Sequence, residues 1–253
     1  MLAVERKNII YSRLVAEGRV LVNDLALEFG VTDETIRRDL DKLEAEGLAE
    51  KIYGGALKRD NSFVEQPYII RKSANVSAKK KIASLAAELI SDGSYIALDS
   101  GTTSLEVARA ISNRNCITVI TNSVQILAEV ATRSDWTVIS TGGVLKNGSL
   151  SLVGSTAEKI VSGFHVDIAV CSCKGLSLTD GCTDSSEQEA EIKRQFFKSA
   201  KKKILAADSS KLDRVSFADV CKFNDFDVFI TEKRPNDEWV EKLAQSNVEL
   251  IYP

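Results

Sequence analysis

Apolar and polar residues alternate along the first 57 positions in a pattern that predicts three helices. Apolar residues recur at helical spacing over 3–16, which is the first predicted helix. Asn23 is placed to cap a second helix over 24–29. Thr32 is placed to cap a third helix that runs to about Glu46. Only a tight turn is left between the second and third helices.

The third predicted helix has one apolar and one polar face. Ile36, Leu40 and Leu43 fall together at i, i+4 and i+7, and we expect them to pack on the first two helices. Arg37 and Arg38 then stand among polar side chains that face away from this core. Arginine pairs bidentately with guanine and with phosphate, so this edge suits contact with the major groove of double-stranded DNA.

A two-stranded ribbon is predicted directly after this helix. Residues 48–57 contain two short extended stretches joined by Gly54-Gly55, a pair that favours a tight turn. Helix, turn, helix and ribbon in this order are the parts of a winged helix-turn-helix, which favours DNA binding. The alternative for the third helix alone is an ordinary amphipathic helix whose arginines form surface ion pairs with Asp39 or Asp41.

The pattern changes after the ribbon. Residues 58–76 lack clean periodicity and contain Pro67, so we expect a linker there. From residue 77 short apolar strands alternate with helices, which predicts an α/β domain with a mainly parallel sheet over 77–253. The expected strands are 95–98, 117–120, 136–140, 168–171, 203–207, 228–230 and 248–251, and the expected helices are 77–91, 103–112, 123–133, 155–162, 185–200 and 236–246.

Composition limits the classes of function. The chain has 253 residues, 44% of them hydrophobic, and no apolar run approaches the ~18 residues of a membrane span. Charges interrupt the first apolar stretch, which is not a signal peptide. The five cysteines form no C-x-x-C pair and His165 is the only histidine, so we expect free thiols in a reducing cytoplasm and no metal site.

Charge does not by itself indicate a nucleic-acid partner. The net charge is −3, and residues 1–59 hold ten Lys or Arg against eleven Asp or Glu, a balance of −1. Any contact with DNA must then come from where the basic residues stand rather than from their sum.

A small polar turn follows the first predicted strand of the larger domain. Asp99-Ser100-Gly101-Thr102-Thr103 opens a helix, and N–H groups and hydroxyls at a helix N-terminus bind anions. Asp99 could accept from sugar hydroxyls, and the alternative for this turn alone is helix capping. There is no G-x-x-x-x-G-K-[ST] motif, so we expect neither a nucleoside triphosphate nor a cofactor. Similar turns end four later strands, where ligands of open parallel sheets bind; they lie at 121–123, 140–143, 173–175 and 208–211.

Both halves of the chain resemble the DeoR family of bacterial regulators. In the first half the resemblance rests on Arg6-x-x-Ile9, Phe29-Gly30-Val31-Thr32, Thr35-Ile36-Arg37-Arg38-Asp39-Leu40 and Tyr53-Gly54-Gly55-Ala56, with Tyr53 where the family often has histidine. In the second half it rests on 99–103, Thr121-Asn122, Gly142-Gly143, the Glu189-x-x-x-Lys193 helix and Ala207-Asp208-Ser209-Ser210-Lys211.

This resemblance implies a winged helix-turn-helix over 1–57, a linker over 58–76, and an effector-sensing and oligomerisation domain over 77–253 with a ribose-5-phosphate isomerase-like α/β fold. It implies a cytoplasmic, homo-oligomeric repressor of carbohydrate-metabolism genes that binds double-stranded operator DNA and is controlled by a phosphorylated sugar. The implied DNA-binding residues are Thr32, Thr35, Arg37, Arg38, Lys42, Tyr53, Gly54 and Gly55. The implied effector-binding residues are Asp99, Ser100, Gly101, Thr102, Thr103, Asn122, Gly142, Lys174, Glu189 and Lys211, with 100–103 holding the phosphate.

Two other interpretations of the second domain stay open. A sugar-phosphate isomerase with an accessory N-terminal domain would need a general base and an acid, roles in which Asp99 and Glu189 can be imagined. The lysine- and glycine-rich loop expected of such isomerases is not evident after residue 171, which favours a regulator over an enzyme. A pure oligomerisation module would bind no metabolite. Glu189 and Lys193 also have a plain alternative, an i, i+4 ion pair on a helix surface.

Overall fold

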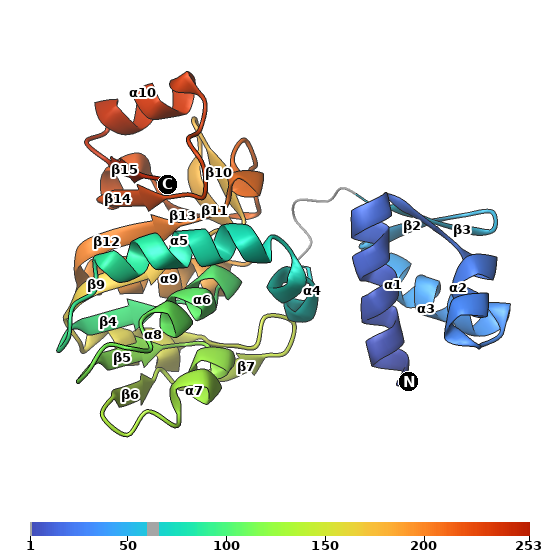
Figure 1. Cartoon of the computed structure of the whole chain (residues 1–253), viewed down its shortest axis with the longest axis horizontal. Helices are drawn as coiled ribbons and strands as arrows, with labels where there is room; N and C mark the ends of the chain where they lie inside the picture. Colours follow the sequence, from blue (N-terminus) through green and yellow to red (C-terminus); the bar gives the residue numbers. More distant parts are fainter. Residues whose placement is uncertain (1, 60–65) are drawn as a thin grey trace. The chain divides into compact units, whose positions relative to one another are not determined.

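The computed structural model describes residues 2–59 and 66–253, and the chain divides into two compact units, residues 1–74 and 75–253 (Figure 1). The strands of the first unit form an antiparallel sheet in the order β1-β3-β2, so the predicted ribbon gains a third strand. The elements of this unit are α1 (Ala3–Glu17), β1 (Arg19–Leu21), α2 (Val22–Phe29), α3 (Asp33–Ala45), β2 (Ala49–Ile52), β3 (Gly55–Lys58) and α4 (Tyr68–Ser73).

Helix α3 packs through the face that its apolar spacing predicts. Ile36, Leu40 and Leu43 are buried in one core with Ile10 and Leu14 of α1. Burying a side chain of this size stabilises a fold by roughly 1.5–3 kcal/mol. The burial of this face leaves the opposite edge of α3 in solvent.

The first turns of α2 and α3 are stabilised in different ways. Thr32 caps α3 as predicted, because its Oγ1 accepts a hydrogen bond from Thr35 N at 3.3 Å. The predicted cap of α2 is wrong: this helix begins at Val22, and Asn23 is an exposed residue inside it. Val22 N donates to the carbonyl oxygen of Gly54 at 2.8 Å, so a distant turn satisfies the end of α2.

A buried ion pair joins α3 to α1. Arg6 Nε donates to Asp39 Oδ2 at 2.6 Å, and the two side chains are only 10% and 2% exposed. A short distance in a buried setting makes this pair sensitive to the loss of either partner. It therefore fixes the orientation of α3 on the rest of the first unit.

Part of the expected linker is regular structure. Lys58 ends β3, helix α4 begins after Pro67, and Val76 already belongs to the next helix. Ile70 of α4 is buried in the core of the first unit. The sequence did not indicate α4 because a six-residue helix is too short to reveal its period. The middle of the expected linker, residues 60–65, lies outside the described residues.

A seven-stranded parallel sheet forms the centre of the second unit. The strand order is β15-β14-β12-β9-β4-β5-β6. All seven expected strands are present, with ends shifted by at most three residues. After β4 the sheet first grows toward β6 and then restarts at β9 on the other side, so the direction of winding switches between β4 and β9. The strands are β4 (Tyr95–Leu98), β5 (Thr118–Thr121), β6 (Thr137–Ser140), β9 (Val166–Cys171), β12 (Ala200–Ala206), β14 (Val228–Ile230) and β15 (Glu249–Ile251).

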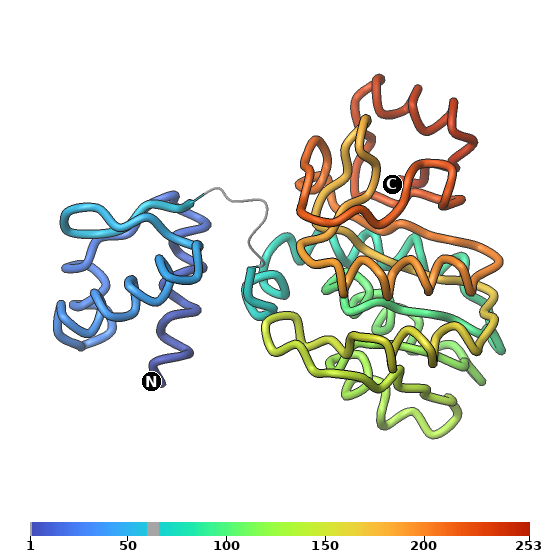
Figure 2. The backbone as a smooth tube through the Cα atoms, turned by 180° about the vertical axis from the view of Figure 1, so that it is seen from behind, coloured from blue at the N-terminus to red at the C-terminus, as the bar shows by residue number. Residues whose placement is uncertain are grey.

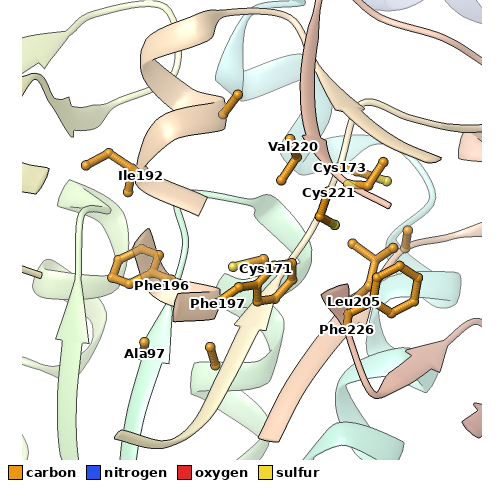
Figure 3. Close-up of a cluster of buried hydrophobic side chains, with 14 of the residues drawn as sticks. Ala97, Cys171, Cys173, Ile192, Phe196, Phe197, Leu205, Val220, Cys221 and Phe226 are labelled. Carbon is orange, nitrogen blue, oxygen red and sulfur yellow. The ribbon is translucent and has the colours of Figure 1, made fainter. Parts of the chain in front are cut away.

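Helices cover both faces of this sheet. One face carries α5 (Val76–Glu88), α6 (Thr102–Ala110) and α7 (Val124–Val130), and the other carries α8 (Ser155–Ser162), α9 (Glu187–Ser199) and α10 (Asp237–Gln245). In Figures 1 and 2, α10 lies at the β15 end of the sheet and the α7 region lies at the β6 end. The largest core lies under α8, α9 and α10. Phe196 and Phe197 of α9 lie beside Cys171 of β9 in it (Figure 3).

Five short antiparallel strands were not expected from the sequence. β7 (Val144–Lys146) pairs with β8 (Ser151–Val153), and a second small sheet has the order β10-β11-β13, formed by Gly175–Ser177, Gly181–Asp184 and Ala218–Cys221. These five segments mix apolar residues with glycine, serine or charged residues, and they lack the continuous apolar run that indicates a buried parallel strand. Two single-turn helices, η1 (Ser209–Lys211) and η2 (Phe223–Asp225), complete the unit. Within the described ranges, no helix is long and apolar enough to cross a membrane.

We expect Asp39→Ala to destabilise the first unit by about 3–5 kcal/mol, because it leaves the Arg6 guanidinium buried without its partner. Hydrogen–deuterium exchange of the α1 and α3 amides across a denaturant series measures the change. Asp41→Ala is the matched control, because Asp41 forms an exposed ion pair with Lys51 and such pairs contribute about 1 kcal/mol or less. Equal losses from the two substitutions would contradict this role of the buried pair.

Candidate functional site

The outer edge of α3 is exposed and basic. The side chains of Arg37 and Arg38 are 54% and 73% exposed. Each makes only a loose i, i+4 ion pair, Arg37 with Asp33 at 3.7 Å and Arg38 with Glu34 at 3.4 Å. Solvent-exposed pairs of this kind are weak, so both guanidinium groups can exchange their partner for a phosphate or a base.

The ion pairs with Asp39 or Asp41 that the sequence suggested as an alternative are wrong. Asp39 is buried against Arg6, and Asp41 pairs with Lys51 of β2. Three further residues predicted to contact DNA belong to α3 and its N-cap. Of these, Thr32 and Lys42 are exposed and Thr35 is half-buried.

The tip of the ribbon consists of Tyr53 and Gly54, between β2 and β3. Tyr53 is fully exposed, and Gly54 has a φ of 77°, which glycine adopts without strain. Gly55 is a buried residue of β3 rather than part of the turn. A Cβ on Gly55 would lie 2.1 Å from the carbonyl oxygen of Val20, so the small size of Gly55 lets β3 approach β1.

In the second unit, a buried lysine lies where β4 and β9 end. Lys193 of α9 donates to Asp99, which follows β4, and to the carbonyl oxygen of Ser172, which follows β9, at 2.6 Å for the latter. Its Nζ lies 3.1 Å from Asp184 Oδ2 of β11. Asp99 also accepts from Ser172 N at 3.0 Å and from Ser104. This one ammonium group therefore ties together three segments that are distant in sequence.

Electrostatic pairing keeps this cluster ionised. Burial alone raises the pKa of Asp184, but the charges of Lys193 and Lys174 outweigh it and hold that pKa below its ordinary value. Burial lowers the pKa of Lys193, but Asp184 and Asp99 outweigh it and raise that pKa well above its ordinary range. The buried group thus holds two carboxylates around one cation.

A third buried carboxylate, Glu189, lies one helical turn before Lys193. Its Oε2 accepts from Ser100 Oγ at 3.0 Å and its Oε1 accepts from Ser151 Oγ at 2.5 Å. Glu189 and Lys193 are 3% and 4% exposed, so the surface ion pair considered from the sequence is wrong. Both face inward and bind different partners.

The turn at 99–103 leads into α6, whose N-terminus points to the carboxyl edge of the sheet. Gly101 N donates to Asp99 Oδ1 at 3.0 Å, and a Cβ on Gly101 would lie 2.8 Å from the same oxygen. Thr102 and Thr103 are buried in the first turn of α6. Asn122 follows β5, donates through Nδ2 to the carbonyl oxygen of Leu152 at 3.2 Å, and has a buried Oδ1 with no protein partner.

The remaining sequence-predicted residues, Gly142, Lys174 and Lys211, lie along the same edge. Gly142 follows β6, two strands from β4, with a φ of 58° and open space around its missing side chain. Lys174 follows β9 and Lys211 follows β12, and both are half-buried. The structure therefore joins Ser100 to Glu189 and Gly101 to Asp99 by hydrogen bonds, and Gly142, Lys174 and Lys211 follow other strands of the same edge. No three His, Cys, Asp or Glu side chains of the described segments are grouped so that they could hold a metal ion.

Family models match nearly all of this chain. A model described as the DeoR-like helix-turn-helix domain matches residues 6–62, and one described as the DeoR C terminal sensor domain matches residues 74–233. The chain belongs to the DeoR family. In this DeoR-family protein the helix-turn-helix model covers α3 and the ribbon, and the sensor model covers the carboxyl edge of the sheet.

Relatives with curated names are similar to this chain over nearly its full length. The uncharacterised HTH-type transcriptional regulator YulB of Bacillus subtilis is 35% identical over 99% of this chain and 96% of the relative. The HTH-type transcriptional regulator GlpR of Haloferax volcanii is 33% identical over 99% and 98%. The HTH-type transcriptional repressor GlcR of B. subtilis is 32% identical over 98% and 95%.

Among solved structures, the chain is similar to ribose 5-phosphate isomerase A of Methanocaldococcus jannaschii. The TM-score is 0.38 and the identity 18%, over 53% of each chain. A likeness of this size decides neither the activity of the DeoR-family protein nor its site.

Sequence inspection missed four members of the buried cluster, namely Ser104, Ser151, Ser172 and Asp184. Ser151 and Asp184 lie on β8 and β11, two of the short strands that the pattern did not predict. Ser172 acts partly through its backbone N–H and carbonyl groups, which no side-chain pattern reveals. Ser104 alone carried a signal, since it lies within the first turn of the predicted helix after Asp99.

We expect Lys193→Met to destabilise the second unit by about 3–5 kcal/mol at pH 7, because two buried carboxylates lose their cation. Asp184, whose folded pKa is lowered, stabilises the wild-type fold above its unfolded value of 3.8 and loses that contribution as the pH falls through the lowered value. Lys193, whose pKa is raised, keeps its contribution until strongly alkaline pH. The deficit of the variant should therefore shrink as the pH falls below about 4.

Urea unfolding of the second unit at several pH values, with Lys198→Met as the control, measures this deficit. Lys198 is exposed on the same helix, so its substitution should cost little at any pH. A deficit for Lys193→Met that does not change with pH would rule out the carboxylates as its cause.

Proposed function

We propose that this chain is a sequence-specific transcriptional regulator that binds double-stranded operator DNA through residues 1–57. The observation that carries the proposal is α3: its apolar face is buried while Arg37 and Arg38 stand exposed on the opposite edge. A recognition helix needs this division, because the buried face fixes the helix and the exposed side chains reach base edges and phosphates.

Other residues of α3 and of the ribbon are proposed to contact the DNA beside the two arginines. We assign them to Thr32, Thr35 and Lys42 on α3 and to Tyr53 and Gly54 at the tip of the ribbon, which would lie along the phosphate backbone. Gly55 contributes by allowing the ribbon to form, since its Cα is packed against Val20. The net charge of this segment is close to zero, so binding depends on these placed side chains rather than on a general basic surface.

Residues 77–253 are proposed to sense a phosphorylated sugar, with residues 58–76 connecting them to the DNA-binding domain. The phosphate would bind the N–H groups and hydroxyls of 100–103 at the start of α6. The buried, unpartnered Oδ1 of Asn122 supports a ligand here, because a sugar hydroxyl donating to it would satisfy a group that otherwise costs free energy. Glu189, Gly142, Lys174 and Lys211 would line the sugar end.

The names of relatives indicate the genes that such a regulator controls. One relative, 31% identical over 87% of this chain and 89% of its own length, is the L-fucose operon activator of Haemophilus influenzae, and GlcR is named a repressor. We propose a repressor of carbohydrate-metabolism genes that its effector releases from DNA. One winged helix contacts few base pairs, so we propose a homo-oligomer, joined through 77–253, that places two of them on a symmetric site.

An isomerase activity is disfavoured by the hydrogen bonds of its candidate base. Asp99 already accepts from Gly101 N, Ser172 N, Ser104 and Lys193. With four donors around its two oxygens, this carboxylate has no free lone pair aimed at a substrate carbon. We therefore propose that the site binds its ligand without turnover.

Arg37→Ala combined with Arg38→Ala is expected to reduce operator affinity at least about 100-fold, since each bidentate base contact contributes about 1–3 kcal/mol. Fluorescence anisotropy with a duplex selected from a random-sequence pool by the wild-type chain measures the loss. Unfolding of the first unit should change by less than about 1 kcal/mol, because both ion pairs are exposed. Arg13→Ala on α1, which removes an arginine paired with Glu28, is the control and should bind normally. Normal operator binding by the double variant would refute the proposed interface.

We expect ribose 5-phosphate, glucose 6-phosphate or fructose 6-phosphate to raise the thermal stability of the second unit. A ligand at 100 times its Kd adds about 2.7 kcal/mol. Asn122→Ala should weaken the effective sugar phosphate about three- to tenfold, the loss of one hydrogen bond. Asn115→Ala is the control, since Asn115 contacts Asp92 at the opposite edge of the sheet. A melting temperature that none of the three compounds shifts would count against this effector class.

A further inference from the structure

The two units meet in the chain at a very short connection. Helix α4 ends at Ser73 and α5 begins at Val76, so only Ala74 and Asn75 lie between them. The division between the units falls between these two residues. Asn75 has a φ of 50° and a ψ of 35°, the left-handed conformation that asparagine tolerates better than most residues. Two residues outside right-handed helical geometry thus separate the two helices, Ala74 in the extended and Asn75 in the left-handed conformation.

The side chain of Asn75 does not cap its own helix. Its Nδ2 donates to Asp208 Oδ1 at 3.0 Å and to Ser210 Oγ at 3.2 Å, more than 130 residues away. Asp208 is 2% exposed, and the same Oδ1 accepts from Ser210 N at 3.1 Å. The first residue of the second unit is therefore held by the loop that follows β12.

That loop belongs to the proposed effector site. Residues 208–211 lie beyond the carboxyl end of β12, in the row that contains Lys211 and Lys174. Ser209 is fixed from the other side, because its N–H donates to Glu232 Oε2 at 2.9 Å and its hydroxyl donates to Glu232 Oε1 at 2.5 Å. A ligand that draws Lys211 toward the site must shift a loop that also holds Asn75.

We propose that Asn75 is a positioning residue that couples effector binding at the 208–211 loop to the connection between the sensor and the DNA-binding domain. The amide clamp holds the α4–α5 connection in one geometry while the loop is free of ligand. Movement of the loop on ligand binding releases the clamp and changes the population of backbone geometries at Asn75. This coupling rests on the proposed function, because it requires an effector at the carboxyl edge of the sheet.

Asn75→Gly tests the proposal, because glycine keeps the left-handed backbone and removes only the amide. The operator Kd is measured by anisotropy with and without the sugar phosphate that shifts the wild-type melting temperature, and the Kd of that sugar phosphate is measured by calorimetry. In the wild type the ligand should change the operator Kd by about 5- to 150-fold. In Asn75→Gly we expect a change below about twofold, because the ligand-free operator Kd of the variant should already lie close to the value that the ligand produces in the wild type, while the sugar-phosphate Kd of the DNA-free protein stays within about threefold of wild type.

A donor–acceptor exchange provides the rescue. Asn75→Asp sets two carboxylates against each other and should also uncouple the sites. Combining it with Asp208→Asn restores one amide and one carboxylate in the opposite order, and the ligand effect on operator affinity should return. A merely structural role for Asn75 would alter stability without this pattern. Wild-type coupling in Asn75→Gly, or no recovery in the double variant, would overturn the proposal.

Failure of the effector class is recognised separately. If none of the three sugar phosphates stabilises the wild type, the proposed effector is wrong and the ligand-driven release falls with it. Hydrogen–deuterium exchange of the full chain without added ligand still tests whether the Asn75 side chain holds the connection and the 208–211 loop together. Asn75→Gly should speed exchange at the amides of 76–79 and 209–211, and unchanged exchange at both segments would show that no clamp exists.

Discussion

The second unit depends on one buried ammonium group. Lys193 lies between Asp99 and Asp184, and it also bonds the backbone of Ser172, so α9, β4, β9 and β11 all meet at its Nζ. Removing a charge of this kind from water is costly and is offset only when several partners surround it. The requirement to surround Lys193 fixes how the strand ends lie at the edge where we propose that ligand binds.

The first unit uses the same device on a smaller scale. Arg6 and Asp39 bring α1 and α3 into a fixed orientation, while the outer arginines of α3 keep only loose partners. Buried pairs specify geometry and exposed pairs cost little to break. This contrast within one helix separates a residue that positions the interface, Asp39, from the residues that would touch DNA, Arg37 and Arg38.

The sequence predicted features whose causes are local and missed those whose causes are distant. The periodic face of Ile36, Leu40 and Leu43, the Thr32 cap and the seven parallel strands depend on short-range spacing, and all were predicted. Asn23 failed as a cap because the carbonyl of Gly54 satisfies α2 instead. The sequence left open whether Glu189 and Lys193 pair on the helix surface, because both alternatives look identical along a helix, and only the surrounding strands decide that they face inward.

Hydroxyl groups at the carboxyl edge of the sheet already donate hydrogen bonds within the protein, so a ligand bound there would have to replace some of these bonds. Ser100 donates to Glu189, and a phosphate at 100–103 would need the same hydroxyl. It would also bring a dianion beside the buried Glu189 carboxylate, which is unfavourable unless Glu189 changes its partner. Glu189 in turn holds Ser151 of β8. Ligand binding at this edge therefore cannot leave the network in one arrangement, and a site with two mutually exclusive arrangements suits a switch better than a catalyst, which benefits from a fixed one.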